Sequence, residues 1–320
     1  MKIWCDRANN QRVAWHCRSH PETAESNAYA EVFQLQRSFI GTSPVHVPTV
    51  ADIQVVTRRP ADERPAVILL ELPNRHLGCQ TYPYDDLVQI SRLCRAANIR
   101  LHLDGARLWE IQPFYNRPFA DLARLFDSVY VSLYKGLRGT VGCVLASSDA
   151  AFMAEAALWQ RRLGGWMVTS YPVLIDCERA FNLNIGTFER KWRKMCAVAA
   201  AIVQATKDFT TSDGRPIVYF TPEVPTCCQV HTHIRGVTRE RLAAARDEVE
   251  RDLGLSVFPW TLPSPFMHEL DPDWVLVNGD PLAVQGMDQY FEWSITDKNV
   301  DIPDAVFAQG WRAIVTVLFA

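Results

Sequence analysis

The chain has 320 residues, 48 % of them hydrophobic and 22 % charged, which is close to ordinary globular usage. Its formal net charge of −3 argues against a dedicated nucleic-acid binder and against intrinsic disorder. No apolar run reaches the roughly 18 residues that a membrane span needs, and the N-terminus shows no secretory signal. The nine cysteines are odd in number and scattered, which favours reduced thiols over a disulfide framework. We therefore expect a cytoplasmic globular protein of about two domains.

The first half of the sequence alternates between strand-like and helix-like segments. Residues 66–72 (Ala-Val-Ile-Leu-Leu-Glu-Leu) form an apolar run that is typical of a parallel strand covered on both faces. Residues 83–97 follow with apolar side chains at helical spacing. We predict further strands at residues 12–16, 99–103, 128–133 and 142–146, and a helix within residues 27–37. This alternation predicts an α/β fold with a mostly parallel sheet.

The second half begins with long helical segments at residues 150–163 and 171–207. Beyond them the pattern changes to short strands mixed with helices, at residues 216–233, 239–253, 274–278, 289–296 and 304–318. Turn residues cluster at residues 210–214, so we place a domain boundary there. We expect a large domain over residues 1–210 and a smaller C-terminal α/β domain over residues 211–320.

Two of the predicted strands end in polar residues. Residues 102–107 (His-Leu-Asp-Gly-Ala-Arg) place Asp104 and Arg107 at one strand end, and residues 132–136 place Lys135 at another. Ligands of open α/β sheets bind at the carboxyl ends of the strands. Burial disfavours the charged form of a lysine, which makes its amine a better nucleophile for carbonyl groups.

An aspartate at one strand end and a lysine at another meet the needs of pyridoxal phosphate. The lysine forms a Schiff base with the cofactor, and the carboxylate pairs with the pyridine nitrogen. Either segment alone fits an exposed loop aspartate or a surface lysine equally well. Their combination, in this order and at strand ends, favours the cofactor site.

At this point the sequence resembles the threonine aldolase and β-eliminating lyase group of pyridoxal-phosphate enzymes, which have the aspartate aminotransferase type of fold. The matching motifs are residues 102–107, 132–137 (Ser-Leu-Tyr-Lys-Gly-Leu), 140–145 (Thr-Val-Gly-Cys-Val-Leu) and 161–167 (Arg-Arg-Leu-Gly-Gly-Trp-Met). The resemblance is good over residues 3–200 and loose in the C-terminal third. It implies a type I large domain with a smaller C-terminal domain.

The resemblance also implies roles for four residues. Lys135 corresponds to the Schiff-base lysine, and Asp104 to the partner of the pyridine nitrogen. Arg107 would face the substrate carboxylate or the phenolic oxygen of the cofactor. His20 falls where the family has a histidine that stacks on the ring and can act as a base.

The activity that the resemblance implies is retro-aldol cleavage of a β-hydroxy-α-amino acid, threonine or allo-threonine, to glycine and an aldehyde. It also implies a homodimer or homotetramer that acts on a small amino acid, with no nucleic-acid or membrane partner. Racemisation and β-elimination remain alternatives within the same family. A homologue that lacks the cofactor, or serves as a structural partner without activity, is the alternative from another class.

Three departures from the family pattern bear on that choice. Residues 1–4 resemble the end of the helix that follows the family's phosphate-binding loop, so we expect that loop to be missing. Val168 stands where the family has an arginine near the cofactor phosphate, and Trp293 where it has an arginine for the substrate carboxylate. The glycine-rich residues 136–142 are a poor substitute for the loop, because glycine patterns alone are weak signals.

Other polar clusters allow a second interpretation. Residues 227–233 contain Cys227, Cys228, His231 and His233, but adjacent cysteines are not a standard chelating spacing, so we expect no metal. Glu25, Asn74 and His76 either line the cofactor site or lie in surface loops, and the sequence leaves both possibilities open.

Overall fold

The computed structural model describes residues 1–258 and 289–319. It divides into two compact units, Met1–His76 with Gln80–Phe188, and Leu77–Cys79 with Glu189–Ala320. The division falls after the first residue of helix α10 (Phe188–Thr206), whereas the turn residues at 210–214 suggested a boundary beyond this helix. Polar contacts explain why α10 belongs to the second unit: Trp192 Nε1 donates to the carbonyl of Pro225, and Arg312 donates to the carbonyl of Ala205.

The first unit is built on a six-stranded sheet in the order β2-β1-β3-β4-β5-β6. The strands are β1 (Arg12–Trp15), β2 (Gln36–Phe39), β3 (Val67–Glu71), β4 (Arg100–Gly105), β5 (Ser128–Ser132) and β6 (Cys143–Ala146). All neighbouring pairs are parallel except β5 and β6. Every residue of β3 is buried, as its apolar run predicted.

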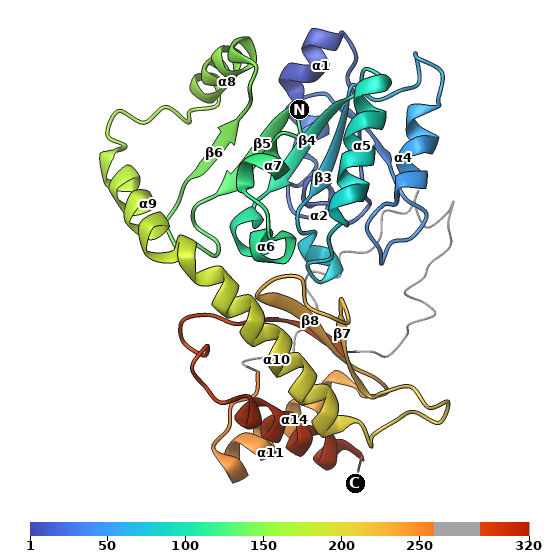
Figure 1. Cartoon of the computed structure of the whole chain (residues 1–320), viewed down its shortest axis with the longest axis vertical. Helices are drawn as coiled ribbons and strands as arrows, with labels where there is room; N and C mark the ends of the chain where they lie inside the picture. Colours follow the sequence, from blue (N-terminus) through green and yellow to red (C-terminus); the bar gives the residue numbers. More distant parts are fainter. Residues whose placement is uncertain (259–288, 320) are drawn as a thin grey trace. The chain divides into compact units, whose positions relative to one another are not determined.

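Helices surround this sheet (Figure 1). They are α1 (Lys2–Ala8), α2 (His20–Thr23), α3 (Ala28–Glu31), α4 (Val50–Thr57), α5 (Tyr84–Ala96), α6 (Leu108–Tyr115), α7 (Phe119–Ala123), α8 (Ala150–Arg162) and α9 (Tyr171–Asn184). Short 3-10 turns span Arg75–Leu77 and Ile185–Thr187. Helix α5 packs beside α4 and buries Leu87, Ile90 and Cys94, which share one helical face.

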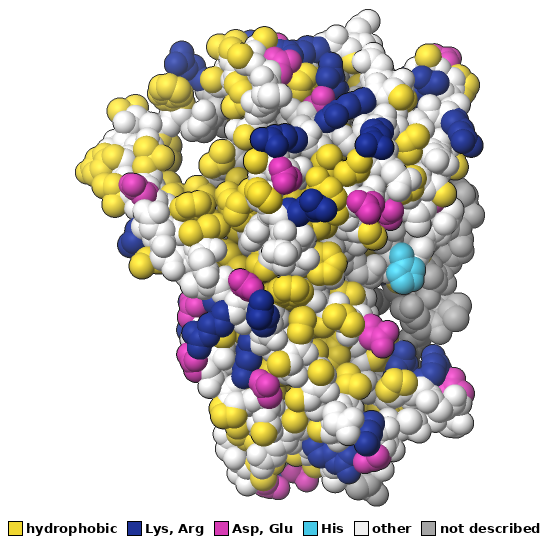
Figure 2. All heavy atoms as spheres, viewed as in Figure 1, with side chains coloured by type: hydrophobic (Ala, Val, Ile, Leu, Met, Phe, Trp, Pro, Cys, Tyr) yellow, Lys and Arg dark blue, Asp and Glu magenta, His cyan; other side chains and the backbone are white. Residues whose placement is uncertain are grey.

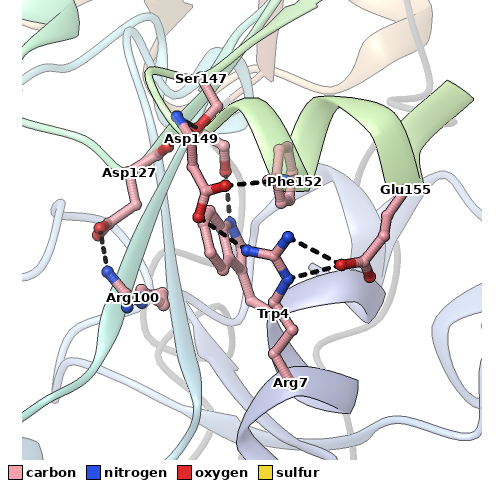
Figure 3. Close-up of polar contacts among 9 residues, drawn as sticks. Trp4, Arg7, Arg100, Asp127, Ser147, Asp149, Phe152 and Glu155 are labelled. Carbon is pink, nitrogen blue, oxygen red and sulfur yellow. Dashed lines mark hydrogen bonds and ion pairs between the residues drawn. The ribbon is translucent and has the colours of Figure 1, made fainter.

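Polar contacts join α1 to α8 and to the start of β5 (Figure 3). The Trp4 ring stacks on Phe152 at 4.4 Å between ring centroids, and its Nε1 donates to Ser128 Oγ at 3.0 Å. Arg7 forms ion pairs with Asp149 at 2.7 Å and Glu155 at 2.8 Å. Helix α1 is therefore fixed to the first unit.

The segment at residues 27–37 differs from the predicted helix. Only Ala28–Glu31 is helical, and the chain then enters the edge strand β2. Asn27 and Gln34 have φ values of 58° and 54°. Such left-handed conformations interrupt an α-helix, which explains the difference.

The second unit contains a three-stranded antiparallel sheet in the order β7-β8-β9. Its strands are β7 (Val218–Thr221), β8 (Gln229–Ile234) and β9 (Gln289–Ser294), and its helices are α10, α11 (Arg239–Leu253) and α14 (Asp304–Phe319). Helices α11 and α14 pack against each other. The expected smaller α/β domain is thus present, while the predicted strand at residues 274–278 lies outside the described residues.

Candidate active site

The candidate site of the first unit lies at the carboxyl ends of its parallel strands. Glu71 ends β3, Asp104 lies near the end of β4, and Lys135 follows β5. Glu71 and Asp104 are paired neighbours in the strand register. Parallel strands end at the same edge of a sheet, so residues from distant parts of the sequence meet there.

A cavity of about 460 Å³ runs along the sheet, lined by Leu69, His102 and Tyr130 of the strands, and reaches this edge. His20, Asp104 and Lys135 line it, as the sequence predicted for one shared site, together with Glu25 and Tyr134. Its other walls are mainly apolar and include Tyr29, Phe33, Leu145, Phe152, Trp159 and Leu163. A mainly apolar hollow with a few convergent polar groups is the usual form of a small-molecule site.

Lys135 is the candidate nucleophile of this group. Burial is the main cause that lowers the pKa of its amine, and the positive charges of Arg107 and Arg75 lower it further. The carboxylates of Asp104 and Glu110 act in the opposite direction without reversing the shift. A lysine with a lowered pKa holds more of its free amine at neutral pH, which is the form that attacks a carbonyl.

The carboxyl of Asp104 is held by a backbone hydrogen bond from the turn that follows it and lies near three basic groups. Its Oδ1 accepts a hydrogen bond from the backbone N–H of Ala106 at 3.0 Å. Burial raises the pKa of Asp104 above its ordinary value, and that hydrogen bond and the nearby charges of Lys135, His20 and Arg107 reduce this shift without reversing it. This carboxyl is therefore placed to pair with a cationic ligand group.

His20 begins the short helix α2, with Pro21 at the first turn. Its Nε2 lies 3.0 Å from Oε1 of Glu25, and its side chain is 40 % exposed. The sequence left the position of Glu25 open; the structure places it in the cavity wall beside His20. When the imidazole is neutral and donates Nε2–H to Glu25, its basic lone pair is on Nδ1.

Arg107 connects the ends of β4 and β5 through Glu110. Arg107 Nε lies 3.8 Å from Glu110 Oε2, and Glu110 Oε1 accepts from the backbone N–H of Gly136 at 3.0 Å. A Cβ at position 136 would lie 2.6 Å from the Glu110 carboxylate, so a larger residue there would displace this carboxylate. The glycine after Lys135 therefore serves packing. Arg107 is near Lys135 and Asp104 but is not among the residues that line the cavity.

The sequence interpretation missed three groups of this site: Glu71, Arg75 and Tyr134. Glu71 is buried beside Asp104, and Arg75 is one of the charges that lower the pKa of Lys135. Tyr134 lines the cavity, with Lys135 Nζ 5.7 Å from the centre of its ring. One signal was present, since Glu71 is the only acid within the apolar run at residues 66–72.

The remaining candidates of the first unit lie elsewhere. Asn74 and His76 are buried, and neither is among the residues that line the cavity. Val168 is 99 % exposed on the segment between α8 and α9.

In the second unit, Trp293 is buried in β9. Its ring packs edge-on against Phe307, with 5.4 Å between the ring centroids, so it is a packing residue. His231 and His233 share a face of β8, where His233 stacks on Tyr219 and His231 on Tyr290, at 4.4 and 4.9 Å. Among the described residues, no group of three or more His, Cys, Asp or Glu side chains is arranged to hold a metal.

The residues of the cavity fit pyridoxal phosphate by their chemistry. Lys135 supplies an amine of lowered pKa for the aldehyde group, and Asp104 supplies a carboxyl for the ring nitrogen. The imidazole of His20 lines the same cavity and lies near Asp104. No helix within residues 1–258 or 289–319 is long and apolar enough to cross a membrane.

Comparison with known proteins shows the family of this chain. The family model described as beta-eliminating lyase matches residues 1–235. An aldolase of Penicillium aethiopicum is 34 % identical over 159 residues, which cover 48 % of this chain and 40 % of that protein. The low specificity L-threonine aldolase of Saccharomyces cerevisiae is 31 % identical over 149 residues, covering 47 % and 36 % of the two chains. The chain thus spans less than half the length of these curated relatives.

Solved structures extend the likeness to the fold. A Listeria monocytogenes protein provisionally described as an L-allo-threonine aldolase matches with a TM-score of 0.81 at 29 % identity, over 99 % of this chain and 78 % of that one. A threonine aldolase of Leishmania major, 18 % identical, matches with a TM-score of 0.66 over 96 % of this chain and 78 % of that one. The chain has the type I fold of pyridoxal-phosphate enzymes and belongs to the beta-eliminating lyase family.

Proposed function

We propose that this protein is a pyridoxal-phosphate-dependent carbon–carbon lyase, which cleaves a β-hydroxy-α-amino acid such as threonine or allo-threonine to glycine and an aldehyde. The observation that carries this proposal is one cavity lined by Lys135, Asp104 and His20. The names of the relatives and of the structural neighbour support the same activity.

The chain's own residues divide the work of this reaction. When bound, the cofactor supplies an electron sink for the pair released by the Cα–Cβ bond. Lys135 would hold the cofactor through its amine. Asp104 would supply a negative charge for the ring nitrogen. Arg107 supplies a positive charge near both residues, suited to a substrate carboxylate or a phenolic oxygen.

Cleavage also requires that the β-hydroxyl lose its proton as the aldehyde forms. His20 is the base that we assign to this step, because its imidazole lies in the cavity wall and Glu25 orients it at 3.0 Å. The proton that His20 accepts can return to Cα of the departing glycine. The exposed fraction of His20 lets it exchange protons with solvent between turnovers.

We propose that the chain assembles as a homodimer or homotetramer through the region of α8 and α9. Large apolar side chains are exposed there, including Leu163, Trp166, Met167, Val168 and Tyr171. Figure 2 shows hydrophobic side chains gathered over α9, at the left of the view. Leu163 also lines the cavity, so this surface adjoins the site. Exposed apolar patches of this kind are typical of subunit interfaces.

The test of the activity is aldehyde release from a panel of β-hydroxy-α-amino acids. The purified protein, loaded with pyridoxal phosphate, should release acetaldehyde from threonine or allo-threonine, or the corresponding aldehyde from another member. Lys135→Ala is the matched control and should release none. Equal release by the two proteins, or none by the unaltered protein with the whole panel, would contradict the proposal.

A further inference from the structure

Glu71 is a buried acid beside Asp104 that the proposed mechanism does not use. It ends β3, is 6 % exposed, and is the register partner of Asp104 on β4. An acid in such a place costs folding free energy unless hydrogen bonds compensate for the lost water. Its contacts therefore indicate what it does.

Those contacts hold the start of helix α2. Glu71 Oε1 accepts a hydrogen bond from the backbone N–H of His20. Its carboxyl is also hydrogen-bonded to the side chain of Ser19, which is 2 % exposed and precedes the helix. Both hydrogen bonds therefore hold the backbone around Ser19 and His20, from which the His20 imidazole reaches the cavity. The end of β3 thus fixes the position of His20.

The charges around Glu71 favour its protonated form. Its titratable neighbours are Asp104 on β4, Lys135 after β5 and Tyr82 before α5, and His20 contacts it from α2. The pKa of Glu71 is raised to about 8, mainly by burial and also by the negative charge of Asp104. The hydrogen bonds from His20 and Ser19 and the charge of Lys135 reduce this shift without reversing it.

A neutral Glu71 can still make both contacts. Its carbonyl oxygen accepts from the His20 N–H, and its acid O–H donates to the hydroxyl oxygen of Ser19, because a serine hydroxyl accepts as readily as it donates. Two carboxylates side by side in a buried site repel each other, so one proton stabilises the pair.

We propose that Glu71 is a positioning residue: as a neutral acid it seats His20 at the cavity and leaves the negative charge of the pair on Asp104. This inference rests on the proposed function in one respect: the charge on Asp104 is taken to face the ring nitrogen of the cofactor. The position of His20 and the protonation of Glu71 are properties of the chain itself, so they can be tested without the cofactor.

The first experiment compares the unfolding free energies of the unaltered protein and Glu71→Gln, without cofactor, from about pH 5 to about pH 9. Glutamine copies the neutral acid in shape and cannot ionise. A raised pKa in the folded state means that stability is lost as pH rises from the ordinary range of a glutamate through about 8. The unaltered protein should therefore lose stability relative to Glu71→Gln over this range. Parallel profiles would overturn the neutral form of Glu71.

A matched control is Asp127→Asn at the opposite end of the sheet. Asp127 also accepts a backbone hydrogen bond, from Leu101, and pairs with Arg100 at 2.8 Å. This variant should lower stability by a similar amount at every pH, so its profile should stay parallel to that of the unaltered protein. The comparison separates the loss of any carboxyl from the titration of Glu71.

The second experiment measures the affinity for pyridoxal phosphate and the circular dichroism of the bound cofactor. The affinity of Glu71→Gln for the cofactor should stay within about twofold of that of the unaltered protein. The double variant that combines Ser19→Ala and Glu71→Leu should bind the cofactor at least about tenfold more weakly and show a smaller dichroic band. If variants with Glu71→Leu fail to fold, Ser19→Ala alone tests the positioning of His20, and it should show a smaller loss of cofactor affinity. Unchanged binding and dichroism in these variants would overturn the positioning role. If the unaltered protein binds no cofactor, the proposed function fails while the pH experiment still decides the state of Glu71.

Discussion

The two units of this protein use histidine and other polar residues in opposite ways. In the first unit, His20, Asp104 and Lys135 reach a common cavity from the ends of separate elements. In the second unit, His231 and His233 lie in the middle of β8 and stack with tyrosines of the neighbouring strands. Similar residue types therefore serve a site in one unit and packing in the other.

The position along the strand explains this difference. A side chain in the middle of an antiparallel strand faces its cross-strand neighbours, and His233 is in register with Tyr219 and Tyr290. A side chain just beyond the end of a parallel strand has no such neighbour and is free to face a ligand. Place in the topology thus decides function more than residue type does.

The substitution with the largest expected effect is Lys135→Ala. It removes the amine that the first unit places in its cavity, so covalent attachment of pyridoxal phosphate should be lost and activity should fall to background. Absorption spectroscopy before and after borohydride treatment measures the attachment. Lys194→Ala in the second unit, where Lys194 pairs with Asp304, is the control and should leave the attachment intact. A borohydride-fixed adduct at full yield in Lys135→Ala would show that another lysine holds the cofactor.

Asp104→Asn should have the next largest effect. The change removes the charge opposite the ring nitrogen, and a hydrogen bond to a charged group is worth about 1.5–3 kcal/mol, so cofactor affinity should fall about 10- to 100-fold. Equilibrium titration measures the affinity, with Asp127→Asn as the variant that keeps the site. Equal affinities of Asp104→Asn and the unaltered protein would mean that Asp104 does not face the cofactor.

His20→Gln should lower the turnover rate about 100-fold or more, the usual contribution of a general base, and leave covalent attachment in place. Glu25→Gln keeps the imidazole but weakens its orienting contact, so a smaller loss of turnover is expected. Steady-state kinetics with the best substrate of the panel separate the two effects. A turnover rate that is unchanged in His20→Gln would assign the proton transfer to another group.

The smallest effect on the site is expected from His233→Phe in the second unit. Cofactor affinity should stay within about twofold, because His233 serves packing only.

Burial lowers the pKa of His233 to about 3, so the folded state resists its protonation. A lowered pKa means that stability present above the ordinary range of a histidine is lost as pH falls through it. Denaturation at mildly acidic pH should therefore show His233→Phe less sensitive to acid than the unaltered protein. A fall in cofactor affinity equal to that of Asp104→Asn would contradict the contrast between the units.

Much of the first unit could be predicted because its strands are unambiguous. The buried run at residues 66–72 became β3, and the polar residues after the next two strands were recognised as strand-end groups. Lys135 and Asp104 could be assigned to one site because parallel topology brings strand ends together, whereas His20 was assigned through the family resemblance.

The remaining features depend on backbone conformations and contacts that a sequence does not display. The helix predicted within residues 27–37 is interrupted by the left-handed conformations of Asn27 and Gln34, and neither residue type requires them. Glu71 was read as part of an apolar strand, because only the fold shows that it meets Ser19 and His20. Side-chain partners distant in sequence were thus the least predictable part of the site.

The most direct test of the central claim is to titrate the purified protein with pyridoxal phosphate, fix the complex with borohydride and map the modified peptide. We predict a visible absorption band that saturates at one cofactor per chain, with the reduced adduct on Lys135. Absence of the band, or adducts spread over surface lysines, would show that the cavity at the strand ends does not hold the cofactor.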